Sequence, residues 1–327
     1  MNPLLITTLQ WLGAIGVVLT LTGPIGVLAQ SYPDRPVKII VGFAPGGSSD
    51  TVARLLAQRL TPLLGQPVVV ENKPGAGGVL GADLVAKAPA DGYALLLAVS
   101  GHATAAAMMK KLPFEPVKDF AWVTTLTTYP FVFAAVPQAP FKSLPELIAR
   151  AKAQPGKLSY SSVGVGSAHH LVGEWFNAET GADLLHVPFR GGTSTLVEVL
   201  GGRIDIMVET VTLALPHIQA GKLRALAVTS HQPVDFLPGV PAANQTVPGF
   251  EFQSWLGVAA PAATPAAVVG RLNREIHKVL EQADMRQRLA DLGGAAAPIA
   301  PDTMRAQVET EVARWQRLVK SRGIERQ

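Results

Sequence analysis

The chain has 327 residues, of which 48% are hydrophobic, 16% are charged and 6% are aromatic, a length that allows two domains with a core in each. Its 28 basic and 24 acidic residues give a net charge of +4 without a basic stripe, which argues against a nucleic-acid partner. Cysteine is absent, which excludes disulfides, thiol catalysis and thiolate metal sites.

Residues 1–29 are predicted to be a signal peptide. The mean hydropathy of the chain is +0.26, but only one apolar run is long enough to span a membrane, from Pro3 to Leu28. Residues 1–30 carry no charge, and Val27 and Ala29 supply the small residues of a cleavage site. We expect cleavage after Ala29. The run is long and no basic residue precedes it, so a retained membrane anchor is the alternative.

After residue 29, short apolar segments alternate with amphipathic ones, which predicts strands alternating with helices. We expect strands at 37–43, 67–70, 94–99, 184–187, 204–208 and 223–229, and a short strand before Ser161. We expect helices at 49–63, after Thr264 and at 302–322. A further helix should begin at Ser143, because Ser143 and Glu146 have the spacing of a capping box. This alternation predicts an α/β fold with a mainly parallel sheet and helices on both faces.

Two proline-rich stretches interrupt this pattern. Lys111–Pro140 contains five prolines and Gln232–Pro248 contains four. We interpret these least regular stretches as the places where the chain crosses between two domains, which would make the first domain discontinuous.

Three predicted strand-to-helix loops share one composition. Phe43–Asp50, Ser161–His169 and Phe189–Ser194 each join glycines to Ser or Thr at a predicted helix start. Free N–H groups and the positive end of a helix dipole attract anions at such positions. Any α/β protein needs helix caps, but three such loops in one chain favour a site for a carboxylate.

Signatures of enzymes are missing. Gly156-Lys157 and Gly221-Lys222 are followed by Leu, so neither forms a nucleotide-binding P-loop, and Leu80 stands where the dinucleotide fingerprint of 75–80 needs glycine. No G-x-S-x-G elbow occurs. Adjacent histidines on a helix point about 100° apart, so His169 and His170 make a poor metal pair. We expect no cofactor, no metal site and no catalytic residues.

Five segments resemble the Bug family, the extracytoplasmic solute receptors of tripartite tricarboxylate transporters. They read YPDRPVKIIVGFAPGGSSD (32–50), ENKPGAGG (71–78), PGKLSYSSVGVGS (155–167), HVPFRGG (186–192) and PHIQAGKLRALAVTS (216–230). The resemblance implies a type II periplasmic-binding-protein fold, a Venus flytrap of two α/β lobes joined by two crossing hinge strands. Lobe 1 would comprise residues 30–129 and 254–327, and lobe 2 residues 130–253.

The same resemblance implies a ligand-binding wall in each lobe. Lobe 1 would contribute Phe43, Gly47, Ser48 and Ser100, and lobe 2 would contribute Gly164, Gly166, Ser167, Phe189 and Arg190. The alternatives are that both phenylalanines belong to the core, that Arg190 is a solvated charge, and that Asp50 only caps a helix.

Three residues depart from the family pattern. Gly42 stands where proline is usual, His169 stands before the family's His170 where a small residue is common, and Glu209 stands where Asp is frequent. We include His169 and Glu209 among the ligand-binding candidates, with solvent-facing positions as the alternative. A carboxylate at Glu209 would repel a second anionic group, which predicts a monocarboxylate that bears an amine or hydroxyl.

The function predicted from the sequence is capture of a small carboxylate in the periplasm by a monomeric binding protein, without chemistry on the ligand. The resemblance implies the membrane subunits of a tripartite tricarboxylate transporter as partners. Two alternatives stay open. One is a receptor that signals to a membrane sensor, and the other is an enzyme with an active site between the lobes.

Overall fold

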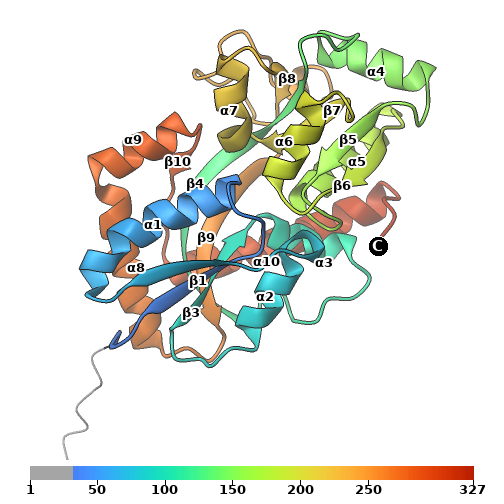
Figure 1. The fold of residues 1–327 in the computed structure, drawn as a ribbon. Coiled ribbons are helices and arrows are strands. Elements are labelled where there is room, and N and C mark those ends of the chain that lie inside the picture. Colours follow the sequence, from blue (N-terminus) through green and yellow to red (C-terminus); the bar gives the residue numbers. More distant parts are fainter. Residues whose placement is uncertain (1–31) are drawn as a thin grey trace, which may run out of the picture. The chain divides into compact units, whose positions relative to one another are not determined.

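A mixed sheet organises residues 32–327, the part of the chain that the computed structural model describes (Figure 1). The predicted signal peptide lies outside these described residues. Along the sheet the strands follow the order β2 (Val68–Asn72), β1 (Val37–Val41), β3 (Ala94–Val99), β9 (Gln253–Pro261), β4 (Phe120–Ala135), β7 (Ile206–Thr210), β5 (Ser159–Ser162) and β6 (Leu185–Pro188). Two further strands, β8 (Arg224–Val228) and β10 (Ala295–Ala296), also pair with β4.

The predicted α/β alternation is confirmed, but the prediction of a mainly parallel sheet is wrong. Pairing is parallel in two blocks, where β1 lies between β2 and β3 and where β5 lies between β6 and β7. Every pairing of β4 is antiparallel, and so is that of β3 with β9. The missed antiparallel part consists mainly of β4 and β9, two strands that the sequence pattern did not predict.

Strand β4 runs through the stretch that we expected to be irregular. Its first half pairs with β9, as far as Pro130 opposite Gln253. From Phe131 onward its partners are β7 and β8 instead. Proline has no N–H to donate to a ladder and is therefore disfavoured in the interior of a sheet. Here Pro130 lies at the point where the ladder changes partners, so the proline signal marks a crossing within a strand and not a loop.

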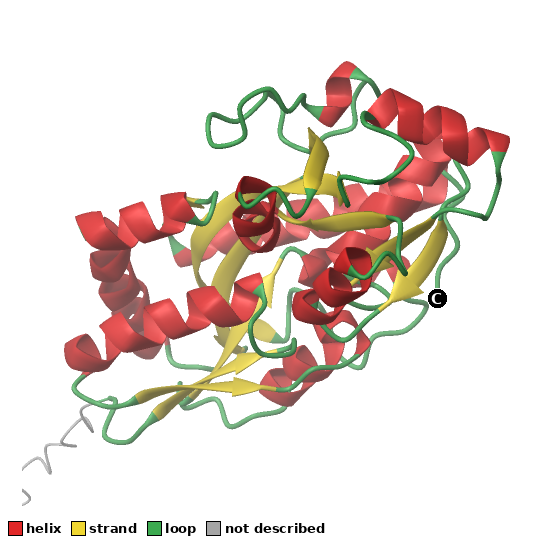
Figure 2. Cartoon of the chain, turned by 45° about the horizontal axis from the view of Figure 1, so that its top comes forward, coloured by secondary structure: helices red, strands yellow, loops and turns green. Residues whose placement is uncertain are grey.

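Helices cover the sheet (Figure 2). They are α1 (Ser48–Leu64), α2 (Val79–Ala86), α3 (Gly101–Met108), α4 (Leu144–Ala153), α5 (Ala168–Thr180), α6 (Gly192–Leu200), α7 (Val211–Gln219), α8 (Ala266–Glu281), α9 (Ala283–Asp291) and α10 (Pro301–Ser321). The four helices predicted individually correspond to α1, α4, α8 and α10. Within residues 32–327, no helix combines the length and the apolar character needed to cross a membrane.

Local sequence signals explain where these helices begin and how they pack. At α4, the Ser143 hydroxyl accepts from the Glu146 N–H, while the Glu146 carboxylate accepts from the Lys142 N–H. In α1, Val52, Leu56 and Leu60 form one buried face. That face lies in the core with β1, so the beginning of α1 stays next to the carboxyl end of the strand.

The packing of α5 against β5 makes a testable prediction. A methyl group at Gly173 would overlap the fully buried ring of Tyr160. Although alanine favours helix, we expect Gly173→Ala to lower the free energy of unfolding by about 1–3 kcal/mol through overpacking. Gly270→Ala in α8 is the matched control, because its methyl group would meet only the flexible end of Arg274 at 3.5 Å. In urea unfolding, the free energy of unfolding of the control should rise by about 0.5–1 kcal/mol. Equal effects of the two substitutions would show that the Tyr160 ring does not restrict the space at Gly173.

His102 in α3 lies in a cluster of aromatic side chains. Its ring stacks on Phe114 at 5.3 Å between centroids and meets the rings of Phe120 and Trp122 edge-on. Its Nε2 lies 2.6 Å from the Pro116 carbonyl oxygen and donates to it. Burial lowers the pKa of His102 from 6.5 to about 4, although the bond to Pro116 opposes the shift.

This lowered pKa predicts a pH dependence of stability. Because the folded pKa lies below the unfolded one, His102 contributes stability above about pH 6.5 that is lost as the pH falls toward 4. The fall of the His102 pKa from 6.5 to about 4 corresponds to roughly 3 kcal/mol. His102→Gln keeps an N–H for Pro116 but does not titrate. In urea unfolding between pH 7 and 4, its free energy of unfolding should therefore fall less steeply than that of the wild type. Parallel pH profiles would rule out this assignment.

Candidate ligand-binding site

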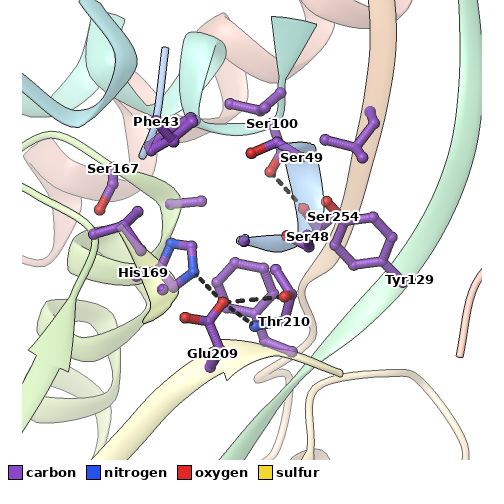
Figure 3. Close-up of a pocket in the computed structure, with 18 residues that line it drawn as sticks. Phe43, Ser48, Ser49, Ser100, Tyr129, Ser167, His169, Glu209, Thr210 and Ser254 are labelled. Carbon is purple, nitrogen blue, oxygen red and sulfur yellow. Dashed lines mark hydrogen bonds and ion pairs between the residues drawn. The ribbon is translucent and has the colours of Figure 1, made fainter. Parts of the chain in front are cut away.

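A cavity with about 470 Å³ of empty space lies beside the point where β4 changes partners (Figure 3). The lining combines residues of both halves of the sheet: Phe43, Gly47, Ser48, Ser49, Val99, Ser100, Gly101, Tyr129, Phe131, Val163, Ser167, Ala168, His169, Gly192, Glu209, Thr210, Ser254 and Leu256.

The beginnings of five helices meet at this cavity. Helix α1 reaches it with Ser48 and Ser49, α3 with Gly101, α5 with Ala168 and His169, α6 with Gly192, and α7 with its cap residue Thr210. The first turn of each helix leaves N–H groups without partners inside the helix, and each helix dipole places partial positive charge at that end. The backbone therefore contributes positive potential to the cavity.

Hydroxyl groups supply most of the side-chain polar atoms of the wall. Among the described residues that line the cavity, none is Lys or Arg. Seven residues of the wall carry a side-chain hydroxyl: Ser48, Ser49, Ser100, Ser167, Thr210, Ser254 and Tyr129. The hydroxyls of Ser100 and Ser254 lie 2.7 Å apart and connect the end of β3 to β9. The arrangement suits an anion that is bound by many neutral donors.

Glu209 and His169 form a buried pair at one side of the cavity (Figure 3). Glu209 is 2% exposed and His169 is 8% exposed, so the alternative that they point to solvent is wrong. The Glu209 Oε1 atom lies 2.8 Å from His169 Nε2 and also accepts from the N–H and hydroxyl of Thr210, at 2.7 and 3.0 Å. Burial alone raises the pKa of Glu209, but His169 and Thr210 together lower it, so the carboxyl is ionised.

The structure brings seven of the eleven candidate residues to the cavity wall: Phe43, Gly47, Ser48, Ser100, Ser167, His169 and Glu209. Gly164, Gly166, Phe189 and Arg190 are not part of this wall. Contact of any of the eleven with a ligand stays a prediction.

The four residues outside the wall have other contacts. The N–H of Gly164 donates to the Ser162 hydroxyl, and the N–H of Gly166 donates to His170 Nδ1. A Cβ atom at Gly164 would lie 2.9 Å from the Gly77 nitrogen, so this glycine permits a close approach of two loops. Phe189 packs partly buried against the core, and Arg190 is exposed.

Four of the lining residues that sequence reasoning missed belong to the two unpredicted strands. Tyr129 and Phe131 come from β4, and Ser254 and Leu256 from β9. Thr210 follows the predicted Glu209 directly, so the same position at the end of a strand could have identified it.

Asp50 acts as a cap in α1 and does not line the cavity. Its carboxylate accepts from the Gly46 N–H at 2.9 Å and also binds Arg54 and Asn72. Burial raises the pKa of Asp50, but the hydrogen bonds from Arg54, Gly46 and Asn72 outweigh burial and lower it. The carboxylate is therefore held away from a ligand, as the alternative for this residue proposed.

The two adjacent histidines of α5 face different surroundings. His169 lies at the cavity, whereas the His170 ring stacks on His186 with centroids 4.0 Å apart. Burial, with a smaller effect of His186, lowers the pKa of His170 to about 3. Within residues 32–327, no three His, Cys, Asp or Glu side chains group closely enough to hold a metal ion.

Comparison with known proteins identifies the family. The profile described as "Tripartite tricarboxylate transporter family receptor" matches residues 52–324. The chain belongs to this family of receptors.

Solved structures share the fold over nearly the whole chain. The periplasmic binding protein BugD superposes with a TM-score of 0.87 at 36% identity, covering 90% of this chain and 100% of BugD. The structure of R. palustris Rpa4515 with adipate superposes with a TM-score of 0.87 at 33% identity, covering 90% of this chain and 100% of that one. The structure of MatC from Rhodopseudomonas palustris with bound malate superposes with a TM-score of 0.85 at 35% identity, covering 88% of this chain and 100% of MatC. The predicted Bug resemblance and the two-lobed periplasmic-binding-protein fold are confirmed.

Proposed function

We propose that this receptor captures a small carboxylated organic compound in the cavity and presents it, in the periplasm, to the membrane subunits of a tripartite tricarboxylate transporter. The observation that carries the proposal is the meeting of five helix beginnings at a cavity rich in hydroxyls. Adipate and malate in the two R. palustris relatives support a carboxylate as the ligand. The description of the family supports the transporter as partner.

The carboxylate would be bound by charge-assisted hydrogen bonds from first-turn N–H groups and serine hydroxyls. Such bonds are stronger than those between neutral groups, and a cavity shielded from water increases their contribution. The absence of Lys and Arg from the described part of the wall means that fixed dipoles, and not a cationic side chain, would compensate the ligand's charge.

We assign the two lobes as residues 30–129 with 254–327, and residues 130–253. The change of β4 partners between Pro130 and Phe131 supports the first boundary, and the beginning of β9 at Gln253 supports the second. The two strands that cross between the lobes are then β4 and the segment entering β9. Closure of the lobes would enclose the ligand, as in other binding proteins with hinges of this kind.

A charge placed at the beginning of α1 tests the carboxylate site. We expect Ser48→Asp to fold normally, because an acidic residue is favourable in a first helical turn. The new carboxylate would repel an anionic ligand, so affinity for any acid that the wild type binds should fall at least about tenfold. Isothermal titration calorimetry with a panel of mono-, di- and tricarboxylates, including adipate and malate, measures the change.

Ser48→Asn is the matched control, since it has nearly the same shape without the charge. It should retain affinity within a few-fold of the wild type. Equal affinities of the Asp and Asn variants for an acid would show that the carboxylate does not lie near α1. If every acid fails to bind to the wild type while a neutral compound binds, the proposed ligand class is wrong.

Export supplies a separate prediction. The mature protein should be recovered from the periplasm with Gln30 as its first residue, because Val27 and Ala29 fit the specificity of signal peptidase. Mass spectrometry of the intact protein from a periplasmic extract measures this. A protein that keeps residues 1–29 and fractionates with membranes would favour the retained anchor.

A further inference from the structure

The cavity poses a problem of charge. Burial raises the pKa of Glu209, but the charge and hydrogen bond of His169, with the hydrogen bonds of Thr210, outweigh burial and lower it. Among the described residues of the wall, no Lys or Arg faces this carboxylate. A carboxylate ligand would bring a second negative charge into the same buried space. Like charges that share a desolvated site repel each other strongly. The helix dipoles offset part of this repulsion, and a side chain that can accept a proton would offset more.

His169 is placed to carry that proton. Its Nε2 lies 2.8 Å from Glu209 Oε1, and because a carboxylate only accepts, Nε2 is the donor. The other ring nitrogen, Nδ1, is buried and has no hydrogen-bond partner among residues 32–327. Figure 3 shows the ring at the cavity wall, with Glu209 on one side and Ser167 and Phe43 on the other.

The state of Nδ1 decides what the pair presents to a ligand. With a neutral ring, Nδ1 is an acceptor and the pair carries the full negative charge of Glu209. With a protonated ring, Nδ1–H is a donor and the pair is neutral overall. Only the second state suits a carboxylate.

We propose that His169 is the residue that balances the ligand's charge: an acid binds together with one proton, which the His169 imidazole holds while Glu209 fixes the ring through Nε2. Glu209 is then a positioning residue and not a direct partner of the ligand. This inference rests on the proposed function, because it requires a carboxylate in the cavity.

The neighbouring ionisable groups leave His169 as the group that responds. On β4, burial raises the pKa of Tyr129, which keeps its phenol neutral. On α1, Asp50 is paired with Arg54. On α5, burial lowers the pKa of His170 to about 3, so its ring is neutral.

The remaining elements place their ionisable groups away from the cavity wall. On α3, burial lowers the pKa of His102 to about 4. Helix α6 has Glu198 in its last turn, paired with the exposed Arg203, and His217 lies in the last turn of α7. In the loop before α6, Arg190 is exposed.

Proton uptake can be measured directly on the mature protein. Titration calorimetry of adipate and malate in buffers with different ionisation enthalpies, at constant pH, gives the number of protons taken up on binding. Between about pH 6.5 and 8.5 the carboxylates of the ligand and of Glu209 stay ionised, so uptake there reports a histidine. We expect uptake of up to one proton, and affinity that falls as the pH rises, by up to tenfold per pH unit.

Variants assign the proton to His169. His169→Gln keeps hydrogen-bonding groups but does not titrate, so proton uptake and the pH dependence of affinity should both disappear. In Glu209→Gln the repulsion is gone, so adipate should bind more tightly at pH 8.5 than it does to the wild type, with less proton uptake. His231→Gln is the matched control, because His231 forms an exposed pair with Glu251 and does not line the cavity. It should behave as the wild type does.

The outcomes separate this inference from the proposed function. An acid that binds without proton uptake, or with unchanged uptake in His169→Gln, overturns the role of His169 and leaves carboxylate capture intact. Loss of adipate binding in Glu209→Gln, or selective binding of acids that bear an ammonium group without proton uptake, would instead make Glu209 a direct partner of the ligand. If no carboxylate binds at any pH, the proposed function fails and this inference fails with it.

Discussion

The ladder of β4 is the constraint on which the site depends. A single extended strand of 16 residues pairs with β9 in its first half and with β7 and β8 in its second. Because the chain stays hydrogen bonded through this change of partners, the end of β7 pairs directly with β4 at Phe131, and the end of β3 lies one strand away, on the other side of β9. The helices that follow β3 and β7 begin at one cavity. Pro130, which cannot donate a ladder hydrogen bond, occupies the crossing with little loss of pairing.

The electrostatics of the cavity follow from this geometry. Parallel strands followed by helices place helix beginnings at the carboxyl ends of the strands, and two such blocks facing each other direct several dipoles into one space. Against this background Glu209 is unexpected, because a buried carboxylate costs free energy unless it is hydrogen bonded. The N–H and hydroxyl of Thr210 and the His169 ring meet that requirement. These hydrogen bonds thus allow the Glu209 carboxylate to remain in a site whose other groups favour binding an anion.

The sequence predicted the elements with local signals well, and it predicted poorly the elements whose pairing depends on distant residues. Strands with branched apolar residues and helices with clear caps, such as β1, β3 and α4, were found because their signals are local. Strand β4 was missed because Pro130 and its neighbours resemble a loop, and its pairing with β7 and β9 depends on residues far away in the chain. The cavity residues Tyr129 and Ser254 were missed for the same reason, whereas His169 and Glu209 were singled out because they depart from the pattern of the family that the sequence resembles.

Few polar contacts join the loops that face each other across the cavity mouth, and this bears on how a ligand enters. The Ala44 N–H donates to the Arg190 carbonyl at 3.4 Å, the Thr193 hydroxyl donates to the Pro45 carbonyl at 3.4 Å, and the Thr104 hydroxyl donates to the Gly166 carbonyl at 3.1 Å. Two of these bonds are long, and a typical bond contributes only about 0.5–1.5 kcal/mol net. These three hydrogen bonds therefore contribute little to holding the facing segments together. A ligand that bridges the helix beginnings of both proposed lobes would add contacts that only the closed arrangement offers, and would shift the population toward it.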